Sequence, residues 1–188
     1  HLGTLARVYL QPADGVPSDL MVHALFASGE KSGIHALMYS TRGWPAVESL
    51  HFIGLVLLIG NVGVFDLRMI GLARGIPMRA LHRLVPWGIA GYALNVLTGF
   101  LFVVSAPDQY LFNPAFQTKL SLRAVAGFNV LVFYRFVWAR VAPADAGEDA
   151  PRGAKIAAAV SLTCWVGVIV CGRLITYYRP PYHWCFWC

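Results

Sequence analysis

Five ionisable side chains that could hold a polar or anionic group fall within apolar stretches of the sequence. They are Glu48, His51, Lys119, Arg123 and Arg173. Ionisable residues inside a membrane-spanning segment are costly, so they are candidate functional residues by default. One acid, three bases and one imidazole could together bind haem propionates, a quinone head or a lipid phosphate. The structural alternative is an internal ion-pair network that fastens the helices to one another.

His51 is the candidate metal ligand, as an axial ligand of haem iron. Haem b is commonly held by histidines from facing helices. His82 is expected on the opposite side of the membrane, and His35 or His183 could reach His51 only if the chain ends fold back. A bis-histidine haem b site therefore stays open as an alternative to a quinone. A copper site would need Met, Cys and His together, and the sequence shows no such motif.

The four cysteines form two different pairs. Cys185 and Cys188 make a CxxC pair that could be a disulfide, a redox pair or part of a metal site. Cys164 and Cys171 are seven residues apart, which places them on one helical face. We expect this second pair to pack as small apolar side chains.

Four long apolar segments must position these side chains. The chain has 188 residues, of which 57% are hydrophobic and 13% charged, whereas a soluble domain carries about 25% charge. A helix of about 20 apolar residues spans a bilayer. We therefore predict an all-α, integral membrane four-helix bundle embedded in lipid. The predicted spans are residues 47–67, 84–106, 116–141 and 155–178.

Shorter segments flank the four-helix domain, which is predicted over residues 44–178. Residues 1–43 are expected to form an N-terminal periplasmic or interfacial segment with two short helices. Residues 179–188 form an aromatic C-terminal tail, which is typical of a membrane surface.

Basic residues gather in the loops after the first and third spans. Short basic loops of membrane proteins face the cytoplasm. The sequence therefore predicts a multi-pass protein of the bacterial inner membrane with both termini outside, in the periplasm. This topology accounts for the net charge of +6, and no nucleic-acid-binding motif accompanies the charge. The basic residues of these loops are Arg68, Arg74, Arg79, Arg83, Arg135, Arg140, Arg152 and Lys155.

Small and amide side chains inside the spans suggest helix contacts. Gly60 and Gly63 are expected to let another helix approach closely. Asn61, Asn95 and Asn129 either line a transport path or form hydrogen bonds between helices.

A series of short motifs runs from Trp44 to Arg173. In order they are Trp44–Pro45, Glu48, His51, Gly54, Asp66–Leu67–Arg68, Gly71, Pro86–Trp87, Thr98–Gly99, Asn113–Pro114–Ala115–Phe116, Lys119, Ala126–Gly127, Asn129 and Gly172–Arg173. This series resembles a family of uncharacterised bacterial four-helix inner-membrane proteins. The resemblance implies the fold and no particular chemistry. Tyr134 stands where that family often has His, so no ligand is implied there. In layout the chain is also similar to copper-resistance membrane proteins and four-helix b-type cytochromes.

No catalytic nucleophile motif, phosphate loop or metalloprotease signature occurs, so no catalytic residue is predicted. We expect a non-catalytic accessory subunit of a larger membrane-embedded complex, respiratory or photosynthetic, with other membrane subunits as partners. Its small size and aromatic-rich ends support a structural or assembly role. One alternative is an electron-transfer subunit with haem b or quinone at His51. Another is a small transporter.

Overall fold

The computed structural model describes residues 18–144 and 146–178, and within these ranges the chain is helical with no strand. Four segments are long and apolar enough to cross a bilayer: Gly43–Ile70, Met78–Ser105, Pro114–Val141 and Arg152–Leu174. The prediction of an all-α four-helix membrane bundle is therefore confirmed. The tail 179–188, with His183, Cys185 and Cys188, lies outside the described residues.

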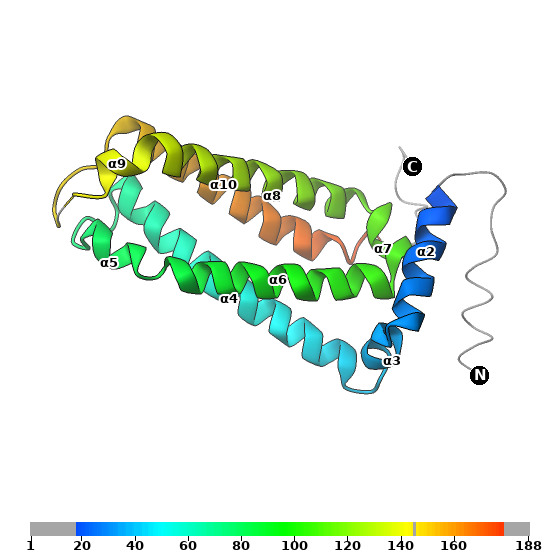
Figure 1. Cartoon of the computed structure of the whole chain (residues 1–188). Helices are drawn as coiled ribbons and strands as arrows, with labels where there is room; N and C mark the ends of the chain where they lie inside the picture. Colours follow the sequence, from blue (N-terminus) through cyan, green and yellow to red (C-terminus); the bar gives the residue numbers. More distant parts are fainter. Residues whose placement is uncertain (1–17, 145, 179–188) are drawn as a thin grey trace.

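The bundle consists of two antiparallel helix pairs (Figure 1). α4 (Gly43–Ile70) packs along α6 (Val85–Ser105), and α8 (Pro114–Val132) packs along α10 (Arg152–Leu174). The pairs meet mainly where α10 lies against α4, whereas the backbones of α6 and α8 hardly approach each other. We call the space between α6 and α8 the seam.

Two glycines allow α4 and α6 to pack closely. A Cβ atom at Gly91 would lie 2.7 Å from the carbonyl oxygen of Gly54, and one at Gly54 would lie 2.9 Å from the oxygen of Gly91. Small residues allow this approach between helices in lipid. The expected contact at Gly60 and Gly63 is wrong, because nothing lies within 4 Å of a Cβ atom at either position.

The Asn113–Pro114 motif fixes the start of α8. Asn113 Oδ1 accepts hydrogen bonds from the backbone N–H groups of Ala115 (3.0 Å) and Phe116 (3.3 Å). These N–H groups belong to the first turn of α8 and have no hydrogen-bond partner within the helix. The Asn113 amide donates to the carbonyls of Ile175 (3.0 Å) and Tyr178 (2.9 Å), just beyond α10. One buried side chain thus starts α8 and ties it to the end of α10.

The third span ends irregularly. A π-helical turn, η1 (Phe133–Val137), follows α8 and leads into α9 (Trp138–Val141). Such turns shift the face that a helix presents to its neighbours. Phe133 of this turn is buried, and Cys164 and Cys171 of α10 are also buried, with free thiols. The expectation that these two cysteines pack as small apolar residues is confirmed.

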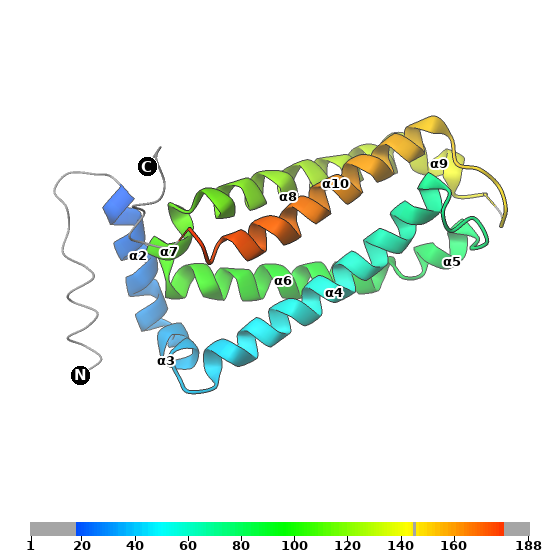
Figure 2. The same ribbon diagram turned by 180° about the vertical axis from the view of Figure 1, so that it is seen from behind.

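Short helices cover one end of the bundle. α2 (Ser18–Lys31), α3 (Ile34–Met38) and α7 (Pro107–Leu111) lie at the end where α4 begins and α6 stops (Figures 1 and 2). His35 Nε2 lies 3.2 Å from the carbonyl of Val104, and the Tyr39 hydroxyl donates to the carbonyl of Ser105 at 2.8 Å. Burial, and secondly the charge of Asp108, raise the pKa of Tyr39 above its usual value.

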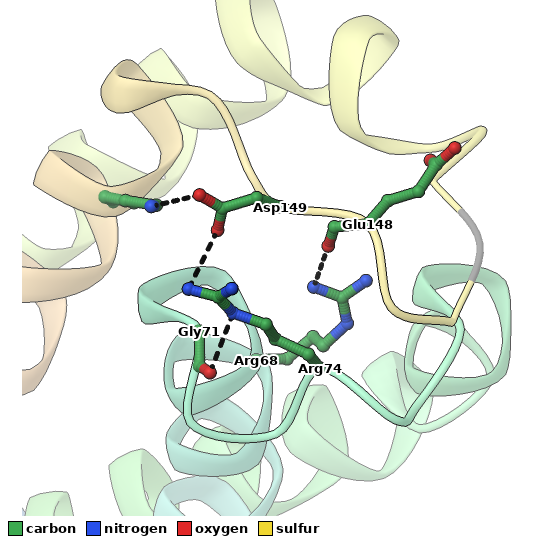
Figure 3. A network of polar contacts seen from close by, with 6 residues as sticks. Arg68, Gly71, Arg74, Glu148 and Asp149 are labelled. Atoms are coloured by element: carbon green, nitrogen blue, oxygen red, sulfur yellow. Dashed lines mark hydrogen bonds and ion pairs between the residues drawn. The ribbon is translucent and has the colours of Figure 1, made fainter.

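Polar contacts fasten the opposite end, near α5 (Met78–His82) and α9 (Figure 3). The buried Arg68 donates to the carbonyls of Ile76 (2.6 Å) and Glu148 (3.1 Å). Asp149 pairs with Lys155 (2.6 Å) and Arg74 (3.4 Å). The Lys155 hydrogen bond, supported by the charge of Arg74, lowers the pKa of Asp149. These contacts join the α4–α5 loop to the α9–α10 loop.

Candidate functional site

His51 lies in a chain of hydrogen bonds between α4, α6 and α8. Its Nδ1 is 2.8 Å from the Thr98 hydroxyl, and its Nε2 is 3.1 Å from the Asn95 amide nitrogen. The same amide nitrogen also donates to the His51 carbonyl at 3.2 Å. Arg123 Nη2 donates to Asn95 Oδ1 at 2.7 Å. We call these four residues the relay.

Arg123 determines the direction of every hydrogen bond in the relay. A guanidinium only donates, so the Asn95 atom that faces it must be the oxygen. The Asn95 NH₂ group therefore faces His51, whose Nε2 must accept and carry no proton. His51 Nδ1–H then donates to Thr98, and the Thr98 hydroxyl donates to the Leu94 carbonyl at 2.7 Å. His51 is thus a neutral imidazole in the Nδ1–H tautomer.

This arrangement does not fit a haem ligand. An axial histidine offers one ring nitrogen to the iron, whereas both nitrogens of His51 are engaged within the protein. His82 stacks on Trp138 at the other end of the bundle, with ring centroids 4.5 Å apart, and His35 bonds to α6. Among the described residues, no group of three His, Cys, Asp or Glu side chains could hold a metal ion.

The other predicted site residues divide into two groups. Lys119 lies close enough to both His51 and Arg123 to interact with them electrostatically, and a Cβ atom at Gly172 would be 3.5 Å from its Nζ. Glu48 and Arg173 are exposed, and Arg173 covers the ring of Tyr177 at 5.8 Å. The structure therefore brings together His51, Lys119 and Arg123, and leaves Glu48 and Arg173 outside the cluster.

A cavity of about 340 Å³ lies between the two helix pairs, along the seam. Most of its wall is apolar. Arg123, which also contacts the Tyr92 ring at 5.8 Å, lies at one end. Leu81, Phe133 and Tyr134 lie at the other. Further lining residues are Leu58, Val62, Phe65, Gly88, Ile89 and Ala126.

Three buried polar atoms without hydrogen-bond partners belong to side chains that line this cavity. They are Asp66 Oδ2 on α4, Arg123 Nε on α8 and Trp165 Nε1 on α10. Asp66 is 3% exposed and Trp165 is 7% exposed, so bulk water does not satisfy them. Ser161, one helical turn before Trp165, offers a hydrogen bond to Asp66. Buried polar groups are nearly always paired, with protein or with ordered water, so these three side chains give an otherwise apolar cavity wall polar groups that can bind a further partner.

Arg123 belongs to both the relay and the cavity. Its Nη2 is held by Asn95, while its Nε has no partner among the described residues. The amides of Asn95 and Asn129 bond across helices, the second to the carbonyl of Ala157 at 2.9 Å, and Asn61 bonds within α4. These contacts favour a structural role for the asparagines over a transport path.

Sequence reasoning missed Asp66 and Trp165 as site residues. Asp66 entered only as part of the Asp66–Leu67–Arg68 motif, and Trp165 was not singled out. Two signals could have found them. Asp66 is an acid at the end of an otherwise uncharged segment, and Trp165 is an indole in the middle of a span rather than at an interface.

Comparisons of the chain with protein-family models, with curated proteins and with solved structures give no match.

Proposed function

We propose that the protein binds a small lipid-soluble molecule with a polar head, of the quinone class, in the cavity between its helix pairs. The observation that carries this proposal is the convergence of Asp66, Arg123 and Trp165, each with an unpaired buried atom, on one cavity. A volume of about 340 Å³ falls in the range of small-molecule sites.

The chemistry of the lining supports a quinone head. A quinone carbonyl accepts hydrogen bonds, and Arg123 Nε–H and Trp165 Nε1–H are donors without acceptors. Asp66 can accept a hydrogen bond from a quinol hydroxyl, or donate to a second carbonyl when it is protonated. The apolar walls suit the ring.

A titration with decylubiquinone tests the proposal. The full chain in lipid nanodiscs should show saturable quenching of tryptophan fluorescence. Trp165→Phe keeps an aromatic ring but removes the indole N–H donor, and its binding is followed through the remaining tryptophans. Arg123→Gln replaces the second donor with a shorter side chain. We expect each to weaken binding about tenfold, the loss of roughly one hydrogen bond.

Paired glycine variants separate the cavity from general effects of added bulk. Gly127 lines the cavity and Gly60 does not, and a Cβ atom at either position meets nothing within 4 Å. Gly127→Leu should block binding, and Gly60→Leu should bind as the unmodified chain does. Quenching that rises linearly, as in simple partition into lipid, or equal binding by both variants would refute the proposal.

A role as accessory subunit of a larger respiratory or photosynthetic complex in the bacterial inner membrane is our second proposal. It is supported by open space around Gly60 and Gly63 on α4, where another chain could pack. Mild-detergent purification from a native membrane tests it. Larger subunits should co-purify with the chain, and Gly60→Leu should release them. A chain that purifies alone under these conditions argues against this role.

A further inference from the structure

We propose that Asn95, oriented by His51, positions the Arg123 guanidinium for the ligand of the cavity, and that a proton taken up by His51 releases Arg123. The proposal rests on the proposed function, because Arg123 is one of the three side chains assigned to the ligand. Asn95 and His51 act here as positioning residues, since neither lines the cavity.

The relay leaves Arg123 one preferred orientation. Nη2 is held at 2.7 Å from Asn95 Oδ1, and the Tyr92 ring lies 5.8 Å from the guanidinium carbon. With these contacts in place, Nε is the buried guanidinium atom that has no partner. The Asn95 amide can hold Arg123 in this way only while its NH₂ group points at His51.

A proton from the aqueous side would bind His51 Nε2, the one ring nitrogen without hydrogen. The new N–H would then point at the Asn95 NH₂ group, so that donor faces donor. Turning the amide over would restore the bond to His51 but would place the NH₂ group against Arg123, which has no acceptor to offer. Arg123 would lose its hydrogen bond to Asn95. His51 and Asn95 would cause this change without touching the ligand.

The cationic side chains around His51 oppose its protonation, and they repel one another more strongly once the ring carries a proton. From α8, Lys119 and Arg123 both act on the ring. From α6 it meets the uncharged side chains of Thr98, Asn95 and Phe102, the last with ring centroids 5.6 Å apart. On α4 itself, Glu48 is exposed. A protonated His51 would therefore be a third cation beside Lys119 and Arg123, and repulsion would help to displace Arg123.

Nitrogen NMR of the isotopically labelled chain tests the relay without any ligand. Because burial, Lys119 and Arg123 oppose protonation of His51, the titration is followed from about pH 8 down to about pH 3, below the usual histidine range. Over this range the side-chain signals of Asn95 and Arg123 should shift together with those of His51. His51→Gln, which can accept from Asn95 but does not titrate, should abolish the shift. His82→Gln is the matched control and should leave it. Arg123 signals that stay fixed while His51 titrates, or an imidazole that stays neutral down to about pH 3, would overturn the proposal.

Decylubiquinone titrations then test the consequence for binding. The unmodified chain should bind about tenfold more weakly at about pH 3 than at about pH 8, a difference of about 1.4 kcal/mol. His51→Gln should lose this pH dependence. Asn95→Leu should bind weakly at both pH values. Thr98→Val, a smaller change that removes the acceptor of the His51 Nδ1–H group, should also bind weakly at both. Equal affinity of all four proteins at both pH values would overturn the proposal. Absence of binding at every pH would refute the proposed function, while the NMR result would still decide the role of Asn95.

Discussion

The carbonyl oxygen of Gly54 lies so close to Gly91 that no side chain fits between the two residues. A Cβ atom on Gly91 would be 2.7 Å from that oxygen and 2.7 Å from the backbone nitrogen of Leu58. His51 precedes Gly54 by one helical turn, and Asn95 follows Gly91 by one turn. The glycine contact therefore sets the distance at which His51 meets Asn95 and Thr98.

We expect Gly91→Ala to destabilise the bundle by about 1–3 kcal/mol, because the added methyl group forces α4 and α6 apart. Unfolding in mixed detergent and dodecyl sulfate micelles measures this loss. Gly60→Ala is the matched control. It adds the same methyl group in open space, so it should be neutral or stabilising by up to about 1 kcal/mol. Equal effects of both variants would contradict the close contact.

Substitution of the buried Asn113 should lower the free energy of unfolding strongly. Asn113→Ala removes the cap of α8 and leaves the carbonyls of Ile175 and Tyr178 without this donor, so we expect a loss of about 2–4 kcal/mol. Asn113→Asp keeps the cap acceptor but sets a buried carboxylate oxygen against the two carbonyls, so it should destabilise the fold at least as much as Asn113→Ala. Thr118→Ala, on the exposed face of the same helix, should change the unfolding free energy by less than about 0.5 kcal/mol. If all three variants unfold alike, Asn113 does not tie α8 to α10.

The Asp149 carboxylate should make the stability of the fold depend on pH. Its pKa is lowered by Lys155 and Arg74, so the carboxylate should persist below the usual aspartate value of about 3.9. A group with a lowered folded-state pKa stabilises the fold at pH values above its unfolded pKa, and this contribution is lost as the pH falls through the folded pKa. Carbon NMR of the carboxyl group measures the value directly. Lys155→Met should raise the pKa toward its usual value, and an unchanged titration would show that the pair does not form.

The orientation in the membrane can be tested by cysteine labelling. In a chain whose own cysteines are replaced by serine, Ser40→Cys lies in an exposed turn before α4, and Gly75→Cys lies in the exposed loop after it. With the basic loops in the cytoplasm, a membrane-impermeant maleimide should label residue 40 in intact cells and residue 75 only after permeabilisation. The reverse pattern would place the termini in the cytoplasm.

The number and approximate extent of the spanning helices could be predicted from hydropathy alone, because a helix must be apolar over the thickness of the bilayer. Which side of each helix faces the interior could not. Lipid is as apolar as the interior of the bundle, so apolar residues occur on all faces and their periodicity carries little information. A helix contact was expected at Gly60 and lies instead at Gly54, because the rotation of α4 about its axis decides which glycine faces α6.

The same physical reason explains the partial success at the site. His51, Lys119 and Arg123 were expected together, and they do lie together, because each projects from a helix toward the same part of the bundle interior. Glu48 shares a helical face with His51 by spacing, but it lies near the start of α4, where the side chain is exposed. Asp66 and Trp165 required the cavity to be recognised, since the cavity exists only where α6 and α8 fail to pack.

The weak approach of α6 to α8 also bears on how the protein is made. α4 and α6 are neighbours in the chain, and so are α8 and α10, so each pair is a helical hairpin whose contacts are local in sequence. Local contacts form quickly, and parts of a chain fold in the order of their synthesis. We therefore expect each hairpin to enter the bilayer and close on itself as it is translated, with docking of α10 against α4 as a later step. The ligand cavity would then arise at the surface where two finished hairpins meet.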